Sequence, residues 1–290
     1  MHMGFRLANI AGRAALVDGD DYFDLSEISG GELGTDPMAA ITMPHRLAEL
    51  SATLGAREPA GRLSDASVGP PIPRPQKSFA VGFNFQAHAD EGGVEAPTVP
   101  LVFTKFPSCL VGPTTDVEMR SDFCDYEGEL VVVIGRGGKD IDRADAWDHV
   151  VGVTVGQDIS DRVAQFEATP PHFDLGKSFD TFGPLGPVLV SVDELADRDN
   201  LRIVCTVNAE VRQSATTAEM TFDVPTLISY LSRITTLAPG DIIFTGTPDG
   251  IGATQGKFLA DGDVITTTID GVGTMTNRCV RVSDYQGDDR

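Results

Sequence analysis

Short runs of branched aliphatic residues, separated by glycine and proline, dominate the chain from residue 77 onward. Such runs, bounded by turn-forming residues, are typical of β-strands. The segments that fit the pattern are residues 78–82, 101–105, 129–135, 150–156, 187–190, 201–207, 241–245 and 263–269. Helical periodicity is rarer and is clearest at residues 224–234. The pattern predicts an α+β domain rich in mixed β-sheet rather than a regular alternation of strands and helices.

The first 75 residues show a different pattern of expected elements. A strand pair is expected within residues 5–17 and a helical patch near residues 45–54, followed by a loop. Four prolines between residues 70 and 75 then stiffen the backbone and prevent a helix from continuing. We therefore expect a small N-terminal α/β module over residues 1–75 and a larger domain over residues 76–290.

Composition narrows the classes of partner. The chain of 290 residues has 43 acidic against 22 basic side chains and a formal net charge of −21, which argues against nucleic acid and anionic membranes. No stretch offers the roughly 18 apolar residues of a membrane span, and no basic region followed by an apolar one opens the chain, so we expect a cytosolic protein. Four scattered cysteines without a CxxC pair suggest reduced thiols rather than a zinc cluster or disulfides.

The clearest candidate chemistry is an acidic pair at the start of a buried strand. Glu127 and Glu129 are two residues apart, so they share one face of a strand, where like charges need a cation to stay ionised. Asp158 ends the next apolar run and supplies a third carboxylate. Three oxygen donors favour Mg²⁺, with Mn²⁺ or Ca²⁺ as further candidates, and give no reason to invoke zinc. The alternative is an exposed Glu-x-Glu edge that only blunts a sheet.

Five motifs in order resemble the fumarylacetoacetate hydrolase family. They are GFNFQAH (residues 82–88), DYEGEL (125–130), QDISDR (157–162), GKSFD (176–180) and TGTP (245–248). Each motif alone is weak, but their shared order over about residues 79–252 is specific. The resemblance implies a β-roll-like domain, a homodimer, and a magnesium or manganese site formed by Glu127, Glu129 and Asp158.

The same resemblance implies an acid–base pair at His88 and Glu91. Residues three apart share a helix face, and a carboxylate beside an imidazole orients it for proton transfer. In the family this pair activates water and lies on a mobile lid. From the residues alone, an ordinary surface histidine is the alternative.

Four further residues are assigned by the resemblance. Lys177 is expected to stabilise a developing oxyanion, although most lysines are merely solvated. Arg162 and Gln165 match positions near the substrate. Thr247 and its neighbouring backbone amides would bind a substrate carboxylate, unless residues 245–248 form a plain strand-ending turn.

These assignments imply a magnesium-dependent hydrolase that cleaves the C–C bond of an acylpyruvate, a 2,4-dioxo acid, into pyruvate and a carboxylic acid. An oxaloacetate-type decarboxylase and an oxo-acid isomerase or hydratase of aromatic catabolism are alternatives within the family. A non-catalytic metal- or anion-binding protein is an alternative of a different class. Phe85, Gln157 and Asp161 depart from the residues usual in the family, so the substrate carries over less securely than the metal.

Overall fold

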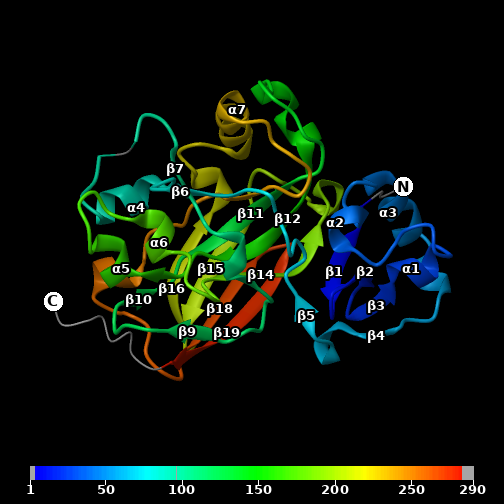
Figure 1. The fold of residues 1–290 in the computed structure, drawn as a ribbon, viewed down its shortest axis with the longest axis horizontal. Helices are drawn as coiled ribbons and strands as arrows, with labels where there is room; N and C mark the ends of the chain where they lie inside the picture. Colours follow the sequence, from blue (N-terminus) through cyan, green and yellow to red (C-terminus); the bar gives the residue numbers. More distant parts are fainter. Residues whose placement is uncertain (1–3, 96, 283–290) are drawn as a thin grey trace.

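A computed structural model describes residues 4–95 and 97–282 and shows a sheet-rich α+β protein (Figure 1). The largest element is a mixed sheet in the order β4-β3-β2-β1-β14-β12-β11-β17-β6-β7, with β5 beside β1 and β8 beside β14. Its strands are β1 (Arg6–Ile10), β2 (Arg13–Asp18), β3 (Asp21–Asp24), β4 (Gly61–Arg62), β5 (Val68–Gly69), β6 (Ser78–Gly82), β7 (Leu101–Thr104), β8 (Leu110–Val111), β11 (Gly128–Ile134), β12 (Val150–Gln157), β14 (Gly183–Val190) and β17 (Ile242–Phe244).

Two smaller groups of strands complete the sheets. A five-stranded sheet has the order β16-β15-β18-β19-β9, and a short antiparallel pair joins β10 to β13. The strands are β9 (Val117–Met119), β10 (Cys124–Asp125), β13 (Ser160–Asp161), β15 (Arg202–Val207), β16 (Glu210–Thr216), β18 (Val264–Ile269) and β19 (Gly273–Arg281). The sequence pattern did not predict β16 or β19, because both carry many polar residues on exposed faces.

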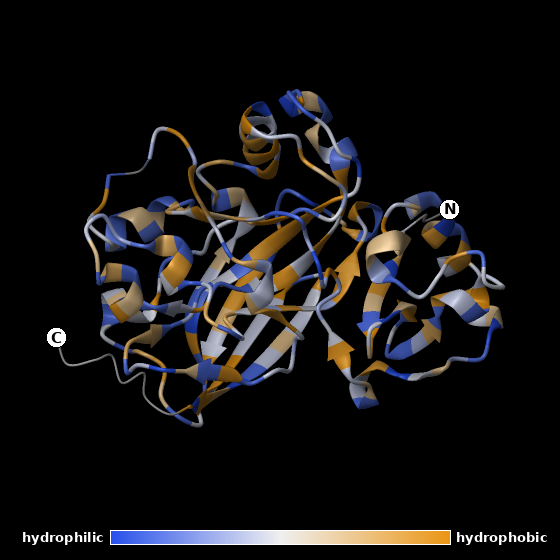
Figure 2. Cartoon of the chain, viewed as in Figure 1, coloured by the Kyte–Doolittle hydropathy of each residue, from blue (hydrophilic) through white to orange (hydrophobic). Residues whose placement is uncertain are grey.

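Every residue of β11 is buried, because β12 and β17 pair with its two edges and apolar side chains cover both faces. The strands at the centre of Figure 2 are accordingly hydrophobic along much of their length. The antiparallel pairing sets Gly128 opposite Gln157. The acidic start of β11 therefore lies beside the end of β12, where Asp158 follows.

Most of the helices are short, and six of them lie in two groups at opposite ends of the molecule, whereas α7 (Val224–Ile234) lies apart from both. They are α1 (Leu25–Ile28), α2 (Pro37–Ala40), α3 (Pro44–Ser51), α4 (Gln86–Glu91), α5 (Arg162–Phe166), α6 (Phe173–Gly176), α7 (Val224–Ile234) and α8 (Gly252–Gln255). In Figure 1, α1 to α3 lie with the N-terminal strands, whereas α4, α5 and α6 lie at the opposite end. No helix in residues 4–95 and 97–282 combines the length and the apolar character of a membrane span.

The predicted helix at residues 224–234 is α7. The carboxylate of Asp223 accepts a 2.9 Å hydrogen bond from the Thr226 N–H and so begins the helix with a side-chain cap. Leu227, Ile228 and Leu231 are buried on one face, and each contributes roughly 1.5–3 kcal/mol by leaving water. The apolar spacing in the sequence thus carries enough information to place this helix.

The N-terminal strands extend the large sheet. β1 pairs with β14 in the antiparallel sense, with Arg6 opposite Val190 and Leu7 opposite Leu189. The predicted strand pair and helical patch are present as β1, β2 and α3. The division of the chain at residue 75 stays a prediction.

Candidate active site

Three carboxylates meet at the junction of β11 and β12. One ligand oxygen from each of Glu127, Glu129 and Asp158 can be chosen so that all lie within 4.8 Å of one another, and all three side chains are buried. The Asp158 N–H donates a 2.9 Å hydrogen bond to the Glu127 carbonyl, which continues the strand pairing past the end of β12. The strand pattern predicted this convergence, because it placed the acids at the ends of neighbouring buried strands.

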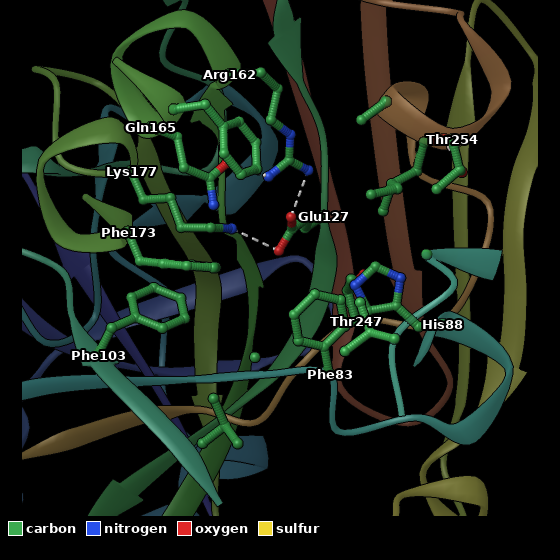
Figure 3. Close-up of a pocket in the computed structure, with 17 residues that line it drawn as sticks. Phe83, His88, Phe103, Glu127, Arg162, Gln165, Phe173, Lys177, Thr247 and Thr254 are labelled. Atoms are coloured by element: carbon green, nitrogen blue, oxygen red, sulfur yellow. Dashed lines mark hydrogen bonds and ion pairs between the residues drawn. The ribbon is translucent and has the colours of Figure 1, made fainter. Parts of the chain in front are cut away.

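Three cations surround two of the carboxylates. Lys177 Nζ donates to Glu127 Oε2 at 2.7 Å and to Asp158 Oδ2 at 2.8 Å. Arg162 Nη2 donates to Glu127 Oε1 at 2.7 Å, and Lys105 Nζ donates to Asp158 Oδ1 at 2.7 Å. In Figure 3, dashed lines join both Lys177 and Arg162 to Glu127. Glu127 and Asp158 are therefore compensated within the protein.

Glu129 is placed differently. Its Oε2 accepts a 2.8 Å hydrogen bond from the Gly246 N–H, and no lysine, arginine or histidine within residues 4–95 and 97–282 forms an ion pair with it. Burial, then the charges of Asp158 and Glu127, raise the pKa of Glu129 well above its ordinary value. A carboxylate in this position needs a further positive charge to be ionised.

The opposite shift occurs at Glu127. Burial alone raises its pKa, but Lys177 and Arg162 outweigh burial and lower the pKa of Glu127 to about 2. Burial likewise disfavours the ammonium of Lys177, yet Asp158 and Glu127 outweigh it and raise the pKa of Lys177. These groups are therefore charged at neutral pH.

The donor set fits a hard divalent cation. All candidate ligand atoms are carboxylate oxygens, which are the donors that Mg²⁺ and Mn²⁺ prefer. Glu129 supports this fit, because a bound cation would supply the positive charge that its carboxylate needs to be ionised. The arrangement gives no sign of the sulfur or imidazole ligands typical of zinc.

His88 and Glu91 form the expected pair on α4. His88 Nδ1 lies 2.9 Å from Glu91 Oε1, and the His88 ring stacks on Phe83 with centroids 5.2 Å apart. Glu91 Oε2 accepts hydrogen bonds from the Gly250 N–H at 3.0 Å and from Thr254 Oγ1 at 2.8 Å. Burial raises the pKa of Glu91, but the bonds from His88, Gly250 and Thr254 outweigh it and hold that pKa below its ordinary value. The carboxylate therefore orients the imidazole while it is itself anchored.

The turn after β17 uses its hydrogen-bond donors within the protein, which differs from the expectation that they bind a substrate carboxylate. The Gly246 N–H donates to Glu129, and the Thr247 hydroxyl donates to the Gly128 carbonyl at 3.0 Å while accepting from Gln213 at 2.8 Å. These donors, which were expected to bind a substrate carboxylate, are used inside the protein. Thr247 still lines the cavity, and a role for it in binding substrate stays a prediction.

Arg162 is also held by the protein. Its guanidinium donates to Asp125, to Glu127 and, through Nη1, to Gln165 Oε1 at 2.8 Å. Arg162 and Gln165 both line the cavity, as the resemblance implied. These hydrogen bonds indicate that Arg162 chiefly positions Glu127 and compensates its charge.

Sequence reasoning missed Lys105 and Asp125. Lys105 follows β7, is fully buried, and bonds to Asp158 and to the carbonyl of Lys177. Asp125 is fully buried and accepts from Arg162 and from the backbone N–H groups of Gly252 and Ala253. For Lys105 the available signal was a charged residue at the end of an apolar run, which is the same signal that identified Asp158, whereas Asp125 follows no apolar run.

One cavity connects these groups. It has a volume of about 340 Å³, and its lining includes His88, Glu127, Arg162 and Lys177. The His88 ring and the Lys177 ammonium lie on opposite sides of it (Figure 3). His88 of the acid–base pair and Glu127 of the carboxylate cluster thus line one space.

Comparisons with known proteins show which families and structures the chain resembles. The family model described as fumarylacetoacetate (FAA) hydrolase C-terminal matches residues 77–280. The human protein named oxaloacetate tautomerase FAHD2A, mitochondrial, is 41% identical over 256 residues, which cover 84% of this chain and 82% of that protein. A crystal structure of a putative HpcE protein from Mycobacterium smegmatis is 43% identical, has a TM-score of 0.90, and is matched over 96% of this chain and 100% of its own.

A third relative was solved with ligands. The structure of maleylpyruvate hydrolase from Sphingobium sp. SYK-6, in complex with manganese(II) ion and pyruvate, is 30% identical and has a TM-score of 0.80. The match covers 95% of this chain and 99% of that one.

Proposed function

Because the chain belongs to the fumarylacetoacetate hydrolase family, we propose that it is a metal-dependent enzyme that moves a proton at C3 of a 2-oxo acid, with keto–enol tautomerisation of oxaloacetate as the leading reaction. The observation that carries this proposal is the shared cavity, in which His88 faces the cluster formed by Glu127 and Lys177. Tautomerisation needs one group to exchange a proton with carbon and another to stabilise negative charge on oxygen. The cavity contains both.

Each residue of the site would have a distinct role in tautomerisation. Glu127, Glu129 and Asp158 would hold the divalent ion, and the ion would supply a Lewis acid that favours negative charge on the 2-oxo group. His88 uses Nδ1 for Glu91, which leaves Nε2 to take a proton from C3 and to return it. Lys177 has three N–H donors and spends two on carboxylates, so one remains for a substrate oxygen. Apolar walls restrict water around these groups.

Hydrolysis of an acylpyruvate is the second candidate, and the His88–Glu91 pair favours it. An imidazole oriented by an anchored carboxylate can take a proton from water as readily as from carbon. Hydroxide would add to the C4 carbonyl, the C3–C4 bond would break, and the resulting pyruvate enolate would gain a proton at C3. The pyruvate in the maleylpyruvate hydrolase structure supports a pyruvate-sized head group at this site.

Three assays separate the candidates. Decay of the ultraviolet absorbance of enol-oxaloacetate measures tautomerisation, and coupled lactate dehydrogenase measures pyruvate released from oxaloacetate or from acetylpyruvate. We expect magnesium to accelerate tautomerisation and excess chelator to abolish the acceleration. Pyruvate from oxaloacetate would indicate decarboxylation, and pyruvate from acetylpyruvate would indicate hydrolysis. No acceleration of any of the three reactions with Mg²⁺ or Mn²⁺ would contradict the proposal.

A homodimer and a cytosolic location also belong to the proposal, and both come from the sequence. Light scattering coupled to size-exclusion chromatography tests the first. Cell fractionation of the native protein tests the second.

A further inference from the structure

The charged groups of the cavity are confined to one part of its lining. Among the described residues that line it, the charged or titratable ones are His88, Glu127, Arg162 and Lys177. The remaining wall is largely apolar and comes from separate segments. It is formed chiefly by Phe103, Phe166, Phe173, Val94 and Ile251.

The aromatic wall begins next to the reacting groups. Lys177 Nζ lies 5.4 Å from the centroid of the Phe103 ring, and the Phe103 and Phe173 rings pack with centroids 5.6 Å apart. Phe166 on α5 adds a third ring and is 59% exposed. Pockets that bind small molecules are lined predominantly by apolar and aromatic side chains of this kind.

Neither permanent cation in the lining is free to bind a second carboxylate. Arg162 is bonded to Asp125 and Glu127, and Lys177 is bonded to Glu127 and Asp158 and has its third donor assigned to the 2-oxo acid head. A carboxylate at the far end of a substrate would meet phenylalanine rings and lose hydration without gaining an ion pair. An apolar group in the same place would lose only unfavourable contact with water.

The volume of the cavity also favours a substrate with an additional apolar group. At about 340 Å³, the cavity falls within the range of roughly 300–1,000 Å³ typical of ligands larger than a four-carbon acid. A 2-oxo acid head beside the carboxylates would leave the space between the rings for a further group.

We propose that the site accepts 2-oxo acids longer than oxaloacetate, that among these it prefers acids with an apolar group beyond C4, of the size of a branched chain or an aromatic ring, and that Phe103, Phe166 and Phe173 bind this group. The inference rests on the proposed function, because the 2-oxo acid head fixes the direction of the tail. Among acids longer than oxaloacetate, those that end in a second carboxylate are the poorer substrates of this site.

Unreactive oxamates test the inference without turnover. Oxamate reproduces the 2-oxo acid head, N-phenyloxamate adds an aromatic ring, and N-oxalylglycine adds a short chain ending in a carboxylate. Calorimetric titration of the magnesium-loaded protein should give at least tenfold tighter binding for N-phenyloxamate than for N-oxalylglycine. Equal affinity, or tighter binding of N-oxalylglycine, would overturn the inference while oxamate binding leaves the proposed function standing. Failure of all three to bind would overturn both.

A matched pair of variants tests the wall itself. Phe166→Lys places a cation beside the tail, and Val211→Lys introduces the same charge at a residue of equal exposure, 59%, that does not line the cavity. We expect Phe166→Lys to shift the affinity ratio toward N-oxalylglycine by at least tenfold and Val211→Lys to leave the ratio unchanged. The same ratio in both variants, with folding verified by thermal unfolding, would overturn the assignment of the wall.

Discussion

The carboxylate of Glu129 accepts a 2.8 Å hydrogen bond from the Gly246 backbone N–H and, within residues 4–95 and 97–282, forms no ion pair with a basic side chain. Glu127 and Asp158 beside it each bind a lysine. This contrast makes Glu129 the residue on which metal binding should act most strongly. It also gives the metal-free protein a distinctive pH dependence.

The free energy of unfolding of the metal-free protein should contain a contribution from Glu129 that falls as pH rises. Its folded-state pKa lies above the ordinary value of 4.5, so above that pH the folded state keeps a proton that the unfolded chain has lost. Glu129→Gln removes this contribution. In chelator, urea unfolding should therefore show the variant gaining stability relative to wild type as pH rises above the ordinary pKa of a glutamate. The exposed Glu58→Gln should track wild type, and parallel curves for Glu129→Gln would contradict the assigned shift.

Replacing His88 by alanine should remove proton transfer and leave metal binding intact. Within residues 4–95 and 97–282, the side chain bonds to Glu91 and forms no hydrogen bond or ion pair with Glu129 or Asp158, so the loss should fall on kcat by roughly 10²–10⁴-fold. His45→Ala, at an exposed residue of α3, is the matched control. A His88 variant that retains full tautomerase and hydrolase rates would show that another group moves the proton.

Asp125→Asn should weaken both the carboxylate cluster and the His88–Glu91 pair. Asp125 accepts from Arg162, which bonds to Glu127, and from Gly252 and Ala253, which precede Thr254 and its bond to Glu91. Breaking one member of this buried ion pair should cost about 3 kcal/mol of stability. Denaturant unfolding measures that loss, and calorimetry and kinetics measure the accompanying loss of metal affinity and kcat.

Asp161→Asn is the control for this change. Asp161 is also buried, but it caps α5 by accepting from Val163 and Ala164, a task that asparagine performs equally well. Similar effects of the two substitutions would contradict a specific role for Asp125.

Lys105→Met should make the protein depend more strongly on metal. Without its ammonium, Asp158 keeps only Lys177 as a cationic partner, and the buried cluster gains net negative charge. Thermal unfolding should show a lower midpoint in chelator and a larger increase on adding Mg²⁺ than in wild type. Lys139→Met, at an exposed lysine, should leave both values unchanged. An equal increase in Lys105→Met and wild type would argue against coupling between this lysine and the metal.

The sequence predicted the strands that are wholly buried and the acids at their ends. Glu127 and Asp158 could be brought together because apolar runs of this length form central strands, and polar residues at their exits stand out. The edge strand β16 was missed because alternating polar residues at its surface weaken the apolar signal. Spacing alone also gave no pairing between β1 and β14, which joins segments more than 180 residues apart.

The hydrogen-bond partners within the site could not be predicted from the sequence. Lys105 is the last residue of the predicted strand at residues 101–105, and only the three-dimensional structure shows that its ammonium reaches Asp158. The Thr247 turn was expected to present free donors, yet Gly128 and Glu129 use them. Such contacts depend on side-chain positions from distant segments.

The most direct test of the central claim is a titration of the metal-free protein with Mn²⁺, followed by electron paramagnetic resonance of the free ion. We predict one tight site per chain in wild type and at least about 100-fold weaker binding in Glu129→Gln, with Glu58→Gln unchanged. Wild type that binds no Mn²⁺, or Glu129→Gln that binds it as tightly as wild type does, would contradict a metal site formed by Glu127, Glu129 and Asp158.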